Sequence, residues 1–154
     1  MGSEPRVITA TRLVQAPAAR VFAHLADPGH HRALDTSGMI RGAAAPGPIT
    51  HAGQVFVMNM HNALKGAHQV ANHVVTFEPD RALGWAPAEP GHPPAGHTWT
   101  WRLEPAGDHC TAVSLTYDWS AFTHTSMLAH LPVVDREGLH ASVAKLAEAL
   151  VPPG

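Results

Sequence analysis

The clearest pattern along the chain is a strict alternation of apolar and polar residues in two segments, 97–103 and 111–119. A period of two predicts half-buried β-strands, each with one covered face and one face in water. The apolar face consists of Trp99, Trp101, Leu103, Val113, Leu115, Tyr117 and Trp119. We expect another part of the chain to cover this face, because so many large aromatic side chains are costly to leave in water.

The same alternation suggests a register for this hairpin. A slip of one residue would turn every side chain of one strand to the opposite face, so the connecting loop must hold an odd number of residues. Gly107 can adopt the positive φ that such a loop requires, and we place it at the centre of the loop. The predicted cross-strand pairs are then Trp101 with Val113, Trp99 with Leu115, and His97 with Tyr117.

Further strands are predicted where β-branched and aromatic residues gather between turn signals. These segments are residues 6–14, 39–45, 54–60, 68–78 and 82–86. The segment 54–60 is apolar on both faces, since Val55 and Val57 lie on one side and Phe56, Met58 and Met60 on the other. Alternation alone therefore leaves open which of its faces is directed inward.

Helical spacing of apolar residues appears near both ends of the chain. After Pro17, residues 18–27 have the pattern of a short amphipathic helix, and residues 30–35 can form a second one. Near the carboxyl end, apolar residues recur at spacings of four, three and four, which predicts a long helix over about residues 134–151. Its buried stripe would consist of Leu139, Val143, Leu146 and Leu150.

This order of elements predicts an α+β fold in a single domain, residues 1–154. We expect a seven-stranded curved antiparallel sheet wrapped around the long C-terminal helix, with two short helices between strands 1 and 2. No other element is long enough to close the sheet. The volume left between sheet and helix would be an internal pocket.

Composition and the lack of known motifs limit the kinds of partner and chemistry that we expect of this chain. The net charge is −2, and no cluster of Lys and Arg could neutralise phosphates, so we expect no binding of nucleic acid. No apolar run is long enough to span a membrane, and the N-terminus lacks a secretion signal, so we expect a cytoplasmic protein. Cys110 is the only cysteine, which excludes an internal disulfide. Nucleophile, phosphate-loop and dinucleotide motifs are absent, and we expect no cofactor.

The motifs of this chain resemble those of the SRPBCC superfamily over nearly its whole length. They are residues 16–22 (APAARVF), residues 74–79 (VVTFEP) before a strand that includes Trp85, and residues 96–99 (GHTW) opening a hairpin that ends in residues 117–119 (YDW). The superfamily includes polyketide aromatase/cyclases, birch-pollen-type plant proteins and START lipid-binding domains. The chain is most similar to its bacterial, polyketide cyclase/dehydrase-like branch. The resemblance implies a helix-grip fold with a cavity for a hydrophobic ligand.

His97 and Tyr117 are the candidate catalytic residues, because they are predicted at the polar end of the pocket wall. An imidazole can transfer a proton near neutral pH, and a phenol can donate to a developing oxyanion. The alternative is that each only satisfies the hydrogen bonding of the other. Aromatase/cyclases that the chain resembles often use an arginine in the pocket, whereas Arg102 is predicted on the outer face.

The residues predicted to bind the ligand are Trp85, Trp99, Trp101, Leu115, Trp119, Met58, Met60, Asn59, His61, His73 and Asp35. Met58 and Met60 could equally be ordinary core. Asp35 begins a turn, where a local role is expected, although it could line the pocket mouth beside His31. No metal site is predicted, because histidines such as His61 and His73 lack a carboxylate or cysteine at a recognisable spacing.

Three functions fit these expectations. The first is binding of a hydrophobic, polyketide-like or polycyclic small molecule, with cofactor-free cyclisation or dehydration by acid/base chemistry. The second is a non-catalytic carrier or sensor for the same kind of ligand, and the third is an interaction module like the activator domains of chaperone co-factors. Converging polar groups would favour the enzyme, an entirely apolar cavity the carrier, and a filled interior the interaction module. We expect a monomer or a homodimer.

Overall fold

The computed structural model describes residues 6–122 and 135–150. The strands are β1 (Val7–Val14), β2 (Ile40–Ala43), β3 (Val55–Asn62), β4 (Gly66–Glu78), β5 (Ala82–Ala88), β6 (Thr98–Pro105) and β7 (Thr111–Asp118). The helices are α1 (Ala18–Leu25), α2 (His31–Leu34) and α3 (Arg136–Ala149), with a 3₁₀ turn, η1 (Pro28–His30), before α2. Every predicted element is present, and its ends differ from the prediction by two residues at most.

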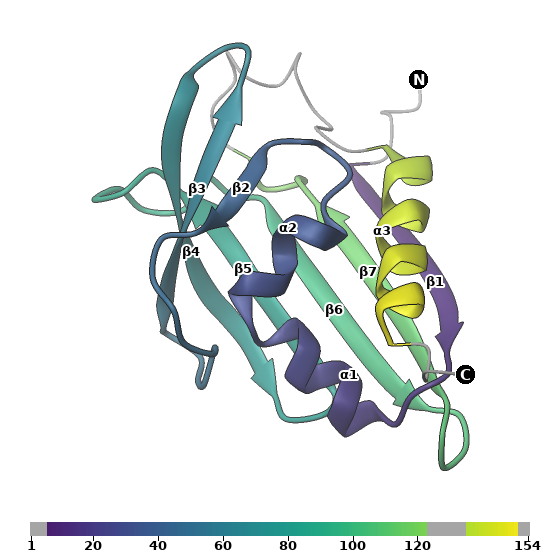
Figure 1. The fold of residues 1–154 in the computed structure, drawn as a ribbon. Coiled ribbons are helices and arrows are strands. Elements are labelled where there is room, and N and C mark those ends of the chain that lie inside the picture. Colours follow the sequence, from purple (N-terminus) through teal and green to yellow (C-terminus); the bar gives the residue numbers. More distant parts are fainter. Residues whose placement is uncertain (1–5, 123–134, 151–154) are drawn as a thin grey trace.

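The strands form one antiparallel sheet in the order β1-β7-β6-β5-β4-β3-β2. Figure 1 shows α1, α2 and α3 on the same face of this curved sheet. Helix α3 packs on β1 and β7, whereas α1 packs on β5 and β6. This arrangement confirms the predicted helix-grip architecture. None of the helices in the described parts of the chain is long and apolar enough to cross a membrane.

Helix α3 is held in place by its apolar stripe. Leu139, Val143 and Leu146 are completely buried, as the spacing of four and three residues predicts. The Asp135 carboxylate caps the first turn by accepting a hydrogen bond of 2.8 Å from the Gly138 backbone amide. Leu150, the fourth residue of the stripe, is buried just beyond the helix.

The predicted register of the central hairpin is wrong by two residues. Trp101 pairs with Leu115 and Trp99 with Tyr117. Strands β6 and β7 end at Pro105 and Thr111, and the Ala106 amide donates to the Cys110 carbonyl at 2.9 Å across the loop. Gly107 does have a positive φ of 118°, but it lies one residue before the middle of the loop. Both registers leave the same side chains on the same face, so the tryptophans still point inward.

The stripe of α3 leads to a test of the fold. Replacing Leu146 by alanine should lower the free energy of unfolding by roughly 2–5 kcal/mol, because it leaves a cavity where a completely buried side chain packed. The control is Glu148→Ala on the exposed side of the same helix, which should change it by less than about 0.5 kcal/mol. Urea unfolding of the variants measures both. Equal effects would show that α3 does not pack on the sheet through this stripe.

Candidate functional site

A cavity of about 520 Å³ lies between the inner face of the sheet and helices α2 and α3. Its wall on β3 contains Met58 and Met60, whereas Val55 on the opposite face is exposed. The open question about this strand is therefore answered: the face with the methionines lines the cavity. The volume falls within the range of about 300–1,000 Å³ that is usual for small-molecule sites.

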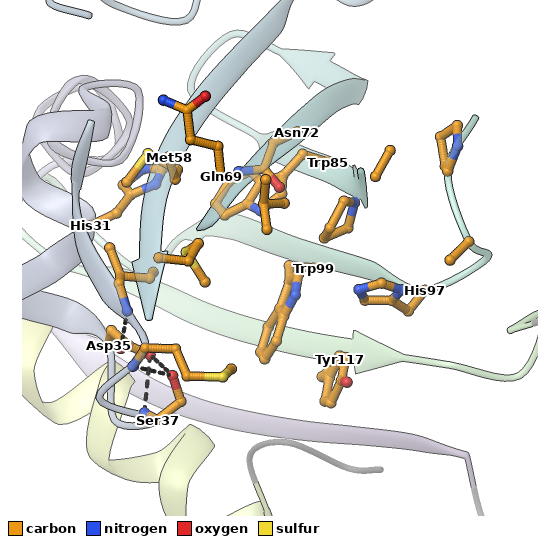
Figure 2. A pocket seen from close by; sticks show the side chains of 18 of the residues that line it. His31, Asp35, Ser37, Met58, Gln69, Asn72, Trp85, His97, Trp99 and Tyr117 are labelled. Carbon is orange, nitrogen blue, oxygen red and sulfur yellow. Dashed lines mark hydrogen bonds between the residues drawn. The ribbon is translucent and has the colours of Figure 1, made fainter. Parts of the chain in front are cut away.

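Aromatic side chains dominate the floor of the cavity. Trp85, Trp99 and Tyr117 are cross-strand neighbours on β5, β6 and β7, so they form one row across the sheet. The rings of Trp99 and Tyr117 are stacked, with centroids 3.9 Å apart and planes 3° apart. Next to this row, Trp101 pairs with Leu115 and both are buried. The floor therefore offers flat, apolar surfaces to a ligand (Figure 2).

His31 lines the cavity from α2, and its position is fixed on both sides of the ring. Its Nε2 lies 2.8 Å from the carbonyl of Leu25, the last residue of α1, which has no partner within that helix. Its ring stacks on Trp85 at 4.9 Å and meets the edge of Phe56 at 5.7 Å. Burial lowers the pKa of His31 from 6.5 to about 4. The side chain is therefore neutral at physiological pH.

His97 and Tyr117, the predicted catalytic residues, both line the cavity. The register places Trp99, and not His97, directly opposite Tyr117. The two rings nevertheless meet edge to face, with centroids 6.4 Å apart, and Phe122 lies 5.3 Å from the imidazole. Figure 2 shows His97 and Tyr117 together at one end of the site, away from His31.

Asp35 lines the cavity but serves the turn after α2. One carboxylate oxygen accepts hydrogen bonds from the backbone amide and the hydroxyl of Ser37, at 3.0 and 2.6 Å. The other accepts from the Ile40 amide at 3.2 Å. These bonds are the local role that an aspartate at the start of a turn is expected to have.

Four residues predicted to bind the ligand do not line the cavity. Asn59 and His61 are exposed on the outer face of β3, where Asn59 accepts a 3.0 Å hydrogen bond from Gln69. His73 is paired with Val55, which places it on that same outer face. Trp119 is buried next to Tyr117, with the centroids of the two rings 5.0 Å apart. Within residues 6–122 and 135–150, no three potential ligands are close enough to hold a metal ion.

Other lining residues were not among those predicted to bind the ligand, although His31 had been placed at the pocket mouth beside Asp35. Asn72 and His68 lie on the inner face of β4, two positions either side of Val70. His31 comes from α2, and no local pattern brings it onto Trp85. Alternation along β4 could have identified Asn72, but only once the inner face of its neighbour β3 was known.

The mouth of the cavity is marked by exposed lining residues. Lys65 from the β3–β4 hairpin and Glu89, after β5, form an ion pair of 2.8 Å at its rim. Pro93 and Pro94 continue the rim toward His97. The end near Trp101 and Leu115 is closed, since both side chains are buried. A ligand would therefore enter beside the loop between β5 and β6.

Comparison with known proteins agrees with this architecture of a sheet that grips a helix around a cavity. The model of the family described as polyketide cyclase / dehydrase and lipid transport matches residues 5–151. The chain belongs to this family. An uncharacterised protein of Mycobacterium tuberculosis, Rv0088, is 35% identical over 109 residues, which are 70% of this chain and 45% of the relative. The chain thus spans less than half the length of that relative.

Several solved structures have a fold similar to that of this chain. Protein CV1439 from Chromobacterium violaceum superposes with a TM-score of 0.68 at 17% identity, covering 96% of this chain and 99% of the other. A point mutant of norcoclaurine synthase from Thalictrum flavum, in complex with a transition-state analogue, superposes with a TM-score of 0.63 at 14% identity, covering 93% and 92%. At these identities the likeness is one of fold.

The burial of His31 predicts a pH dependence of stability. Unfolded His31 binds a proton below pH 6.5, whereas the folded protein resists protonation down to about pH 4. The free energy of unfolding should therefore be highest above pH 6.5 and fall by about 3 kcal/mol from this group as the pH drops to 4. His24, whose pKa is lowered by burial and then by His30, adds to the same trend.

Urea unfolding of the His31→Phe variant between pH 7 and pH 4 tests whether His31 causes this loss of stability. This range covers the interval between the unfolded and folded pKa values of His31. The variant keeps an aromatic ring on Trp85 but cannot be protonated, so its stability should fall less steeply with pH than that of the natural protein. The exposed His61→Ala variant is the control and should keep the natural slope. An unchanged slope in His31→Phe would contradict the assignment.

Proposed function

We propose that the protein binds a flat hydrophobic molecule, polyketide-like or polycyclic, in the cavity between sheet and helix. The observation that carries this proposal is the row of Trp85, Trp99 and Tyr117 along a 520 Å³ space. Apolar surface facing an unfilled space is costly unless a ligand covers it. The family description, which names both polyketide cyclisation and lipid transport, supports the same class of ligand.

We further propose acid/base chemistry on this ligand. Cyclisation and dehydration of polyketide-like chains begin with removal of a proton from a carbon beside a carbonyl group. His97 is the base in this proposal, and the Tyr117 hydroxyl donates a hydrogen bond to the carbonyl oxygen as it gains negative charge. Both lie at the same end of the cavity, with ring centroids 6.4 Å apart. No cofactor takes part in this step.

A carrier without chemistry is the second candidate. The specific observation in its favour is that most of the wall is apolar, with Met58, Trp101 and Leu115 among its buried residues. An interaction module is disfavoured, since it would be expected to have a filled interior. In either role we propose that the chain acts as one domain, monomeric or homodimeric, in the cytoplasm.

Blocking the cavity tests the binding proposal. Met60→Trp should fill space beside the inner face of β3 and weaken binding of the hydrophobic probe 1-anilinonaphthalene-8-sulfonate at least tenfold in isothermal titration calorimetry. Val55→Trp adds the same side chain to the exposed face of the same strand and should change affinity by less than twofold. Equal binding by both variants would place the probe outside the cavity and remove the support for the proposal.

The catalytic proposal is tested with linear poly-β-keto thioesters and product detection by mass spectrometry. The natural protein should convert at least one of them, and His97→Ala should lower turnover roughly 100-fold or more while affinity stays within about tenfold. His61→Ala, outside the cavity, should retain full turnover. Conversion that survives in His97→Ala would exclude His97 as the base. If the natural protein converts none of the thioesters, the catalytic proposal is wrong and the carrier is the better account.

A further inference from the structure

We propose that the cavity contains a subsite for a hydroxylated aromatic ring at Trp85, where His31 Nδ1 accepts the hydrogen bond of the ring hydroxyl and the Asn72 amide binds a second polar atom. This inference rests on the proposed function and adds the polarity and orientation of the ligand. It is carried by two buried polar side chains, His31 from α2 and Asn72 from β4, that line the cavity beside Trp85.

The hydrogen bonding of His31 fixes what it can offer to a ligand. Its Nε2 must carry the proton, because the Leu25 carbonyl at 2.8 Å can only accept a hydrogen bond. In the neutral ring the other nitrogen, Nδ1, then has a lone pair and no proton. The side chain is only 4% exposed and lines the cavity, so the group best suited to Nδ1 is an O–H or N–H of a bound molecule.

Asn72 provides the second position. It is 5% exposed on the inner face of β4, paired with Phe56 and Pro87, and lines the cavity. Its side-chain amide forms no hydrogen bond to the other described residues, and its polar atoms are open to the cavity rather than enclosed by protein. Figure 2 shows Asn72 beside Trp85 within the site. A polar atom of a ligand would satisfy this amide.

Trp85 explains why the hydroxyl group belongs to a flat ring. His31 already covers the tryptophan with a stacked contact of 4.9 Å, and Phe56 closes it from the edge at 5.4 Å. The cavity lining also includes Trp99, the cross-strand neighbour of Trp85, and Met58, whose apolar surfaces favour an aromatic partner. A ring carrying a phenolic hydroxyl matches both the shape and the acceptor at Nδ1.

The position of this subsite also orients the ligand. Asn72 lies on β4 and Tyr117 on β7, so β5 and β6, with Trp85 and Trp99, separate them. Three strand spacings correspond to about 14 Å along the sheet. A molecule that reaches both ends would therefore be long and polycyclic, with its hydroxylated ring at His31 and its reacting carbonyl group at His97 and Tyr117.

The test compares 2-naphthol with 2-methoxynaphthalene, which differ in one hydrogen-bond donor. Binding is measured by isothermal titration calorimetry. The natural protein should bind 2-naphthol about tenfold more tightly. His31→Phe should reduce this preference to less than about threefold while affinity for the methyl ether changes little. A second hydroxyl, in 2,3-dihydroxynaphthalene, supplies the polar atom for Asn72 and should tighten binding further, and Asn72→Leu should remove only this gain. Val75→Ala, an exposed residue on the other face of β4, is the control and should keep the preference.

Removing the Asn72 amide breaks no hydrogen bond to the described residues, so Asn72→Leu remains informative even if His31→Phe folds poorly after losing the Leu25 contact. Equal binding of the two naphthalenes by the natural protein would overturn the subsite but not the proposed function. A preference for 2-naphthol retained in folded His31→Phe, or a gain from the second hydroxyl retained in Asn72→Leu, would also overturn it. Binding of neither naphthalene would overturn both the subsite and the proposal of an aromatic ligand.

Discussion

The cavity follows from one mismatch of size between the sheet and the helix that it grips. Helix α3 lies along β1 and is about 10–12 Å wide with its side chains, whereas seven strands side by side span about 30 Å. The helix packs on β1 and β7 and leaves the middle of the sheet to α1 and α2, which are short. Tryptophans on the strands that α3 does not reach, Trp85 and Trp99, become the floor of a hollow. The binding site is thus a consequence of incomplete coverage.

Much of this fold could be predicted because side-chain alternation and helical spacing are local properties. They identified every element and the inward face of Trp99, Trp101 and Leu115. The register of the hairpin could not be predicted, because a shift of two residues leaves every side chain on its face. Both registers therefore fit the same alternation of apolar and polar residues. The loop after Pro105 determines the register. Gly107 has a positive φ in this loop, but a glycine does not show where the centre of the loop lies.

The candidate site was predictable in its apolar part and much less so in its polar part. His97 and Tyr117 belong to the alternating strands, so the pattern brought them to the cavity despite the wrong register. His31 reaches the cavity through a contact with the Leu25 carbonyl and a stack on Trp85, which lies 54 positions further along the chain. Such contacts leave no periodic signal in the sequence. Asn72 was hidden because its strand has neighbours on both sides whose inner faces had to be known first.

The central claim is that the interior is hollow and takes up a flat apolar molecule between the sheet and the helices. The most direct measurement is a crystal structure after soaking with 1-bromonaphthalene, in which the bromine is located by its anomalous scattering. The account predicts a bromine peak inside the cavity, with the ring system against Trp85 or Trp99. Peaks confined to the outer surface, or an interior filled by the protein's own side chains, would contradict it.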